Sequence, residues 1–169
     1  MKRDARRALL LLTAVIPILL PAGQTYAGKN NNDLESSNKC SKRCSKNANY
    51  MVRVECYTRC IEDNPDNARL YYLRGETYRK VFLFNSAISD FIKVVELEPE
   101  NIDMYYTIAS TAALAYNKEY ALLWLQKALE AGFNDVQRIA SDPSLNNIRN
   151  SREFKDLMDK WDYEFSSLK

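Results

Sequence analysis

The sequence predicts an all-α protein in which helical hairpins are stacked along the chain. Only four of the 169 residues are glycine, no stretch alternates polar and apolar residues as a strand does, and apolar residues recur at steps of three and four. Similar segments also return along the chain, since "EDNPDN" around Pro65 is followed by "ELEPEN" around Pro99. A repeat of about 34 residues is typical of a solenoid, in which each repeat packs against its neighbours.

Residues 1–27 predict a secretory signal peptide. Four basic residues lie within the first seven positions, an apolar run over residues 8–20 follows, and Thr25 and Ala27 are small residues that suit cleavage after Ala27. The apolar run is shorter than the ~20 residues that a membrane-spanning helix needs. We therefore expect an exported protein, in a bacterial periplasm or secreted, with no stable membrane span after cleavage. The polar residues 28–37 are expected to be a flexible lead-in.

The charge of the mature chain is expected to be close to zero. Cleavage would remove four of the 24 basic and one of the 22 acidic residues, which leaves 20 and 21. This balance gives no electrostatic case for binding nucleic acid or an anionic membrane surface. The sequence has no histidine, the commonest general base and metal ligand, and no glycine-rich phosphate loop or nucleophile elbow. We therefore expect no enzyme activity, no cofactor and no metal.

Residues 68–101 contain a motif of large and small side chains, formed by Tyr71, Arg74, Gly75, Tyr78, Ala87, Phe91 and Pro99. The segment resembles a tetratricopeptide (TPR) repeat, whose pattern is W-x-x-L-G-x-x-Y…A-x-x-x-F…P. The resemblance implies two helices, which Gly75 and Ala87 allow to approach closely. Arg74 departs from the pattern, which has leucine at this position.

The motif returns in residues 102–135. Ala109 then takes the place of Gly75, and Leu125 the place of Phe91. Residues 136–169 are expected to be a C-terminal tail with a capping helix, because the last repeat of a stack needs a cover for its apolar face. Ser151 is the expected N-cap of that helix. The resemblance thus implies an α-solenoid of about three TPR-like helical hairpins plus a C-terminal capping helix.

The first repeat, residues 38–67, is degenerate and holds all four cysteines as two C-x-x-x-C pairs. Counting back by one repeat places Cys40, Cys44 and Cys60 on packing positions of the TPR pattern. Residues four apart lie on one face of a helix. In an antiparallel hairpin the two outer cysteines, Cys40 and Cys60, face each other, as do the two inner ones, Cys44 and Cys56. This register predicts the disulfides Cys40–Cys60 and Cys44–Cys56, in a hairpin stapled because its own packing residues are poor.

Two other roles of the cysteines remain open. A thiol-disulfide redox or chaperone factor could act through the twin C-x-x-x-C motif, although such enzymes usually carry C-x-x-C at the start of a helix. A zinc site is the third possibility, although export disfavours free thiolates. The even number of cysteines and the expected oxidising compartment favour the structural disulfides.

The resemblance also implies a function, because TPR arrays bind a peptide or a protein along a concave face lined by the first helix of each hairpin. We expect a protein or peptide partner there, and homo-oligomerisation through the edges of the stack is a further possibility. Tyr72 and Tyr106, which are one repeat apart, would form an aromatic ladder on this face, or else pack between neighbouring hairpins. Glu76 and Asp103 stand where a basic clamp for acidic peptides would need amide or lysine. The expected groove residues are Arg69, Tyr72, Glu76, Arg79, Asp103, Tyr106 and Ser110.

Overall fold

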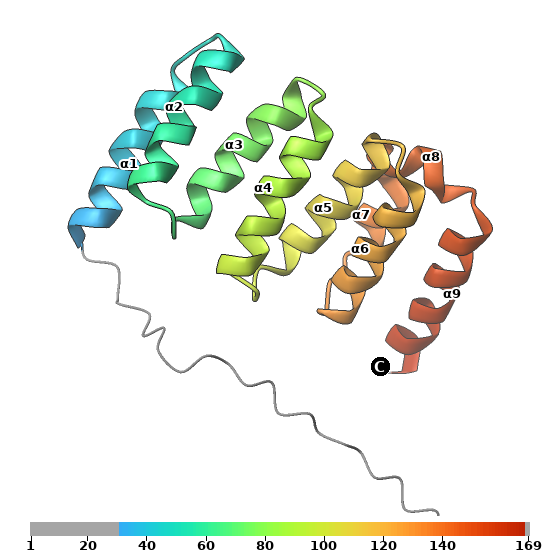
Figure 1. The fold of residues 1–169 in the computed structure, drawn as a ribbon. Helices are drawn as coiled ribbons and strands as arrows, with labels where there is room; N and C mark the ends of the chain where they lie inside the picture. Colours follow the sequence, from blue (N-terminus) through green and yellow to red (C-terminus); the bar gives the residue numbers. More distant parts are fainter. Residues whose placement is uncertain (1–30, 168–169) are drawn as a thin grey trace, which may run out of the picture.

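The computed structural model describes residues 31–167, and within this range every regular element is a helix. Three antiparallel hairpins lie side by side and are followed by shorter helices and a final long helix (Figure 1). This confirms the predicted all-α solenoid. The hairpins are α1 (Asn31–Ser45) with α2 (Tyr50–Asp63), α3 (Ala68–Lys80) with α4 (Phe84–Leu97), and α5 (Ile102–Leu114) with α6 (Lys118–Glu130). The C-terminal part consists of α7 (Val136–Ser141), the 3-10 helix η1 (Pro143–Leu145), α8 (Asn146–Arg149) and α9 (Arg152–Ser167).

The structure describes only part of the N-terminal segments that the sequence predicts. The expected signal peptide, residues 1–27, lies outside the described residues. The expected flexible lead-in, residues 28–37, needs correction, because α1 already begins at Asn31. A polar segment can extend a nucleated helix, since each added residue gains a backbone hydrogen bond at little cost. No helix within residues 31–167 is long and apolar enough to cross a membrane.

The second hairpin is held together by a close approach of its two helices at Gly75. A Cβ atom built on Gly75 would lie 2.6 Å from Cε1 and 2.9 Å from Cδ1 of Phe91, whose side chain is fully buried. In the third hairpin the corresponding positions hold Ala109 and Leu125, and both side chains are buried. A small residue on one helix thus accommodates a large one on the other, as the repeat pattern implies.

The first hairpin shares a smaller core with α3, and the arginine of a largely buried ion pair within the second hairpin also bonds to the first. Its apolar cluster consists of Cys44, Tyr57, Cys60, Ile61 and Leu70. Arg74, on α3, donates from Nε and Nη2 to the two carboxylate oxygens of Asp90 on α4, at 2.9 and 2.7 Å.

The same guanidinium also donates from Nη1 to Oγ1 of Thr58 on α2, at 3.0 Å. Hydrogen bonding to Asp90 raises the pKa of Arg74. Arg74, which stands where the repeat pattern has leucine, therefore connects α2, α3 and α4.

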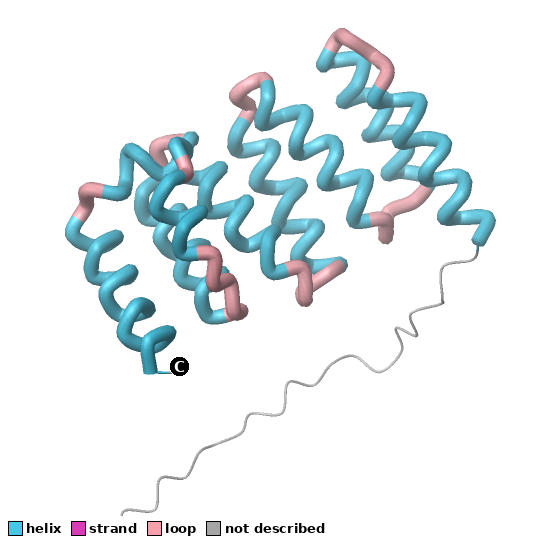
Figure 2. Tube along the Cα trace, turned by 180° about the vertical axis from the view of Figure 1, so that it is seen from behind, coloured by secondary structure: helices cyan, strands magenta, loops and turns pink. Residues whose placement is uncertain are grey.

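The connections between helices lie at two opposite edges of the array (Figure 2). The turns inside the hairpins form one edge, and the links from one hairpin to the next form the other. Inside the second and third hairpins, Phe82 and Tyr116 adopt left-handed backbone conformations, with φ of 62° and 58°. At the end of α6 the same conformation is taken by Gly132, with φ of 98°, which is the residue type that usually ends a helix in this way.

The C-terminal helices cover the end of the stack. The Ser151 side chain accepts a hydrogen bond from the backbone N–H of Phe154 at 3.2 Å, in agreement with the expected cap. Phe154 is buried, and Leu157 and Met158 pack half-buried against the main core. Helix α9 contacts α6, whereas η1 and α8 contact α5.

Candidate functional site

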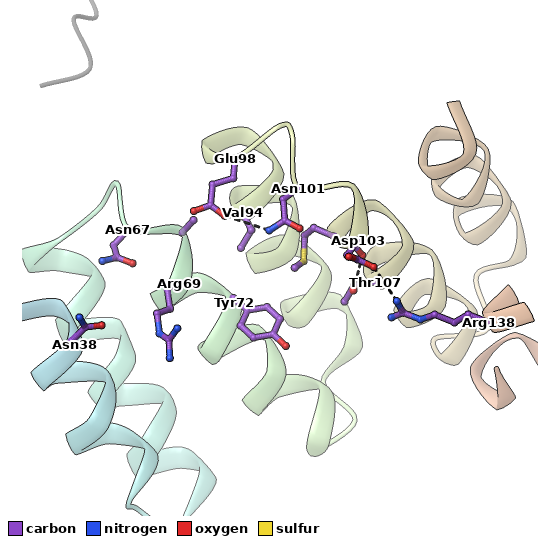
Figure 3. A pocket seen from close by; sticks show the side chains of 12 residues that line it. Asn38, Asn67, Arg69, Tyr72, Val94, Glu98, Asn101, Asp103, Thr107 and Arg138 are labelled. Carbon is purple, nitrogen blue, oxygen red and sulfur yellow. Dashed lines mark hydrogen bonds and ion pairs between the residues drawn. The ribbon is translucent and has the colours of Figure 1, made fainter. Parts of the chain in front are cut away.

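An open cavity of about 690 Å³ lies on the face of the array formed by the first helices of the hairpins. Figure 3 shows it from close by: side chains from α1, α3 and α5 surround the space, and Arg138 on α7 closes one side. Its wall therefore draws on all three hairpins and on the C-terminal part. The lining residues are Asn38, Asn67, Ala68, Arg69, Tyr72, Val94, Glu98, Asn101, Asp103, Met104, Thr107 and Arg138.

The repeat places equivalent residues along this wall. Asn67 is the N-cap of α3, and Asn101, one repeat later, is the N-cap of α5. Arg69 and Tyr72 extend from the first turns of α3, as Asp103 does from the first turn of α5. Successive hairpins therefore present the same helical turn to one cavity.

Charges are distributed unevenly within the cavity. Arg138 Nη1 lies 3.0 Å from Asp103 Oδ1 in an ion pair between α7 and α5, and the Asn101 amide donates to Glu98 at 3.3 Å. Arg69 is exposed and forms no ion pair with another described residue. The end of the cavity toward α1 thus offers a cation, while the carboxylates at the other end are engaged by neighbouring residues.

Tyr72 supplies a flat surface beside this cation. Its side chain is 38% exposed, and its ring centroid lies 6.2 Å from that of buried Phe91, with the two planes at 39°. Because Phe91 supports one part of the ring, Tyr72 can contact a ligand without losing much side-chain freedom.

The structure corrects the expected role of Tyr106. Its side chain is fully buried, stacks on Phe133 with centroids 4.5 Å apart, and lies under the guanidinium of Arg138. The Tyr106 hydroxyl donates to Asp142 Oδ2 at 2.7 Å. Tyr106 therefore packs between the third hairpin and the C-terminal part, and no ladder with Tyr72 forms.

The partly buried hydrogen bond between Tyr106 and Asp142 affects both titrating groups. Burial, together with the hydrogen bond to Asp142, raises the pKa of the Tyr106 hydroxyl. Burial alone would raise the pKa of Asp142, but hydrogen bonds from Tyr106 and Ser144 bring it below its ordinary value. The pair is accordingly a neutral phenol donating to a charged carboxylate.

Three other expected groove residues lie away from the cavity. Ser110 is buried, because η1 and α8 pack on α5. Glu76 and Arg79 form an ion pair with each other at 3.1 Å on α3 and do not line the cavity. Of the seven expected residues, Arg69, Tyr72 and Asp103 line it.

Sequence reasoning also missed several lining residues. Asn67 and Asn101 could have been found because they hold the same position in successive repeats. Arg138 carried no such signal, because α7 lies beyond the repeats and its position against Asp103 depends on how the tail folds back.

The four cysteines form the disulfides Cys40–Cys60 and Cys44–Cys56, the pairs expected for a stapled hairpin. Cys44 and Cys60 are almost completely buried. The Sγ atoms of Cys40, Cys44 and Cys60 lie within 4.8 Å of one another because the disulfides are neighbours. Metal ligation requires thiolates, so the oxidised hairpin offers no metal site here.

Comparisons with known proteins identify the repeat. The sequence profile of the tetratricopeptide repeat matches residues 56–86, from within α2 to the start of α4. A chloroplastic protein of Arabidopsis thaliana is 25% identical over 82% of this chain and 44% of its own length. The SGT1 homolog of Oryza sativa subsp. japonica is 30% identical over 60% of this chain and 26% of its own length. The chain thus spans less than half of either relative.

A solved structure shares the fold. The TPR2B domain of yeast Sti1, in a complex with pHsp70, superposes with a TM-score of 0.50 at 24% identity, covering 79% of this chain and 98% of that domain. Residues 56–86 thus match the tetratricopeptide repeat, and the chain shares the fold of a tetratricopeptide repeat domain.

Proposed function

We propose that the protein is an exported scaffold or adaptor that binds an extended peptide segment of a partner protein in the cavity lined by α1, α3 and α5. The observation that carries this proposal is the open cavity itself, with Arg69 and Tyr72 on one wall. Amide side chains such as Asn38 have both donors and acceptors, as a peptide backbone does. Tyr72 offers an aromatic surface of the kind that dominates protein interfaces.

The expected ligand carries a carboxylate next to an apolar side chain. The exposed guanidinium of Arg69 suits a carboxylate, which it can bind through two parallel hydrogen bonds. The supported ring of Tyr72, one helical turn along α3, suits the adjacent apolar group. The yeast Sti1 domain in its complex with pHsp70 is consistent with a partner-binding role for such an array.

The role we propose is binding without catalysis. The carboxylates in the cavity are engaged, Asp103 by Arg138 and Glu98 by Asn101. Both interactions fix the wall of the cavity.

Export is part of the proposal and is supported by the order of basic, apolar and small residues in the first 27 positions. Buried disulfides persist in an oxidising compartment such as the bacterial periplasm. Cell fractionation and the mass of the isolated protein test this part: a mature N-terminus at Gly28 in the periplasmic or secreted fraction is expected. Cytosolic protein with an intact N-terminus would contradict it.

Binding is tested by selecting peptides from a random peptide library displayed on phage and measuring the selected peptides by isothermal titration calorimetry. Arg69→Ala and Tyr72→Ala should each weaken binding about tenfold or more, as is usual for anchor residues. Arg59→Ala is the matched control for Arg69, since Arg59 is exposed on α2 outside the cavity. If the cavity variants bind as tightly as the wild type, the assignment of the cavity is wrong.

A further inference from the structure

The edge formed by the turns inside the hairpins exposes apolar side chains. We call this the turn edge and define it by residues 45–53, 79–84 and 114–118. Phe82 is 79% exposed and Tyr116 is 85% exposed. Nine large apolar side chains are exposed in the described part of the chain, and six of them lie on this edge, so they are gathered there and not scattered over the surface. These six are Tyr50, Met51, Val52, Phe82, Leu83 and Tyr116.

Two of these aromatic residues occupy strained backbone positions. Phe82 and Tyr116 have φ of 62° and 58°, in the left-handed region that non-glycine residues enter only at an energetic cost. Glycine or asparagine would form the same turn with less strain, as Gly132 does at the end of α6. The side chains bury little surface in return. Strain that folding does not require points to a function of the exposed rings.

The aromatic tip of the second hairpin is also oriented by its neighbour. The rings of Phe82 and Phe84 meet edge to face with centroids 6.0 Å apart, and Phe84 is half-buried. Phe82 is therefore supported from below while its outer face meets solvent.

The turn edge is basic, and the opposite edge is acidic. The three turn segments contain five basic residues, Lys46, Arg53, Arg79, Lys80 and Lys118, and no acidic one. The links between hairpins, residues 62–67, 96–101 and 130–135, contain eight acidic residues and no basic one. The near-zero net charge of the chain therefore conceals a strong separation of charge between two edges.

The positive charge of the turn edge is least compensated at the first two hairpins. Arg79 pairs with Glu76, and Lys118 pairs with Glu153 of α9. Lys46 and Lys80 are exposed and form no ion pair within the described residues. The last turn of α1 adds Lys42, also exposed.

We propose that the turn edge docks on the surface of an anionic lipid bilayer. Aromatic side chains prefer the boundary between headgroups and hydrocarbon, and lysines beside them are attracted by anionic headgroups. The contact is peripheral, since no described helix could span the bilayer. The acidic edge, from which Asn67, Glu98 and Asn101 line the cavity, then faces away from the membrane, and the cavity stays open.

A second copy of the chain fits the turn edge less well. Its acidic links would match the charge, but among the exposed large apolar residues only Val136 lies beside those links. The six apolar side chains would therefore cover carboxylates, and these would lose their hydration without gaining a partner. A bilayer interface accommodates both the rings and the lysines.

The test is flotation of the protein with vesicles of phosphatidylcholine, alone or mixed with phosphatidylglycerol. The protein is isolated from an exporting bacterial host, and its mass is checked, because an uncleaved apolar run at residues 8–20 would itself bind lipid. Binding to the anionic vesicles is expected, with little binding to phosphatidylcholine alone and a decrease as salt is added.

Variants locate the contact on the turn edge. Phe82→Asn combined with Tyr116→Asn should lower the partition coefficient about tenfold or more, and the fold should be kept because asparagine tolerates the left-handed conformation. Lys46→Gln and Lys80→Gln, which are surface changes, should each lower it about fivefold. Leu123→Gln is the matched control: Leu123 is exposed on α6 away from the turn edge, and its loss should change nothing.

The proposal is overturned if the wild-type protein does not float with anionic vesicles, or if the asparagine and glutamine variants float as it does. Sedimentation velocity without lipid tests the alternative that a second copy of the chain binds the turn edge. If the wild type self-associates, the variants do not, and neither binds vesicles, then the turn edge is an interface between copies and the membrane proposal is wrong. Partner-peptide binding in the cavity is measured separately, so that its failure leaves this test unaffected.

Discussion

Adding a single methyl group at Gly75 tests whether the close approach of α3 and α4 limits the stability of the second hairpin. In Gly75→Ala, the new Cβ would lie 2.6 Å from Cε1 and 2.9 Å from Cδ1 of Phe91. Carbon atoms in contact are normally about 3.5–4.0 Å apart. The methyl group therefore needs roughly 1 Å of movement from a ring that is fully buried.

The expected magnitude follows from two opposing effects. Overpacking a well-packed core costs about 1–3 kcal/mol, and the short distances to two ring atoms place Gly75→Ala in the upper part of that range. Replacing glycine by alanine inside a helix gains about 1 kcal/mol of helix propensity. The net expectation is a loss of ~1–2 kcal/mol in the free energy of unfolding, measured by urea denaturation followed by circular dichroism.

The third hairpin provides the compensating change. It carries Ala109 and Leu125 at the positions of Gly75 and Phe91, so Gly75→Ala/Phe91→Leu copies a combination that this fold already accommodates. Phe91→Leu alone should cost about 1.5 kcal/mol or somewhat more, from lost contacts. The double variant should be more stable than the sum of the single changes by ~1 kcal/mol, as a coupled pair requires.

Two results would refute this reasoning. If Gly75→Ala is as stable as the wild type or more stable, then the ring moves aside freely and helix propensity decides the outcome. If the double variant shows only the sum of the single changes, the two positions are not coupled. In that case the alternation of small and large residues in the repeats has another cause.

Three further predictions concern the ion pair, the disulfides and the half-buried carboxylate of Asp142. Asp90→Ala should lower the free energy of unfolding by ~3 kcal/mol, the low end of the range for a buried pair, because Arg74, whose side chain is 17% exposed, loses its partner; replacing both residues by leucine should cost much less, and an equal loss would show that the ion pair is not responsible. Thiol titration of the native protein should find no accessible thiol, and reduction should remove ~3 kcal/mol of stability for each disulfide; rapid reduction without loss of helix would instead favour redox activity. Because the folded-state pKa of Asp142 is lowered, its contribution to stability should be complete above the unfolded-state pKa of about 4 and lost as the pH falls through the folded-state value. Asp142→Asn should flatten this acid limb of a pH titration of stability, and an unchanged limb would contradict the assignment.

The sequence predicted those features that depend on the repeat. The hairpins, the close approach at Gly75 and the cysteine pairs all followed from the register of the repeat, because the register fixes which side chains face each other. It also placed Arg69 and Tyr72 on the cavity wall. These are properties of helix geometry and of one repeat packing on the next.

Other features depended on contacts that the register does not describe. Asp90, the partner of Arg74, is buried on a helix face where the repeat pattern names no acidic residue. Tyr106 was misplaced because the residues that cover it belong to the tail, which follows no repeat. The separation of charge between the two edges was missed because only the net charge was counted. The charged residues were visible in the sequence, but their meaning required knowing which turns share an edge.

The packing of α7, η1 and α8 against α5 also limits the ligand. These helices occupy the inner surface of the third hairpin, with Tyr106 buried beneath them and Arg138 at the boundary. A bound chain can therefore advance along the inner surface only as far as Asp103 and Arg138, and any further length must leave toward α1. Within residues 31–167 the array thus has a stop at one end of the cavity and none toward α1, so the proposed ligand would extend toward α1.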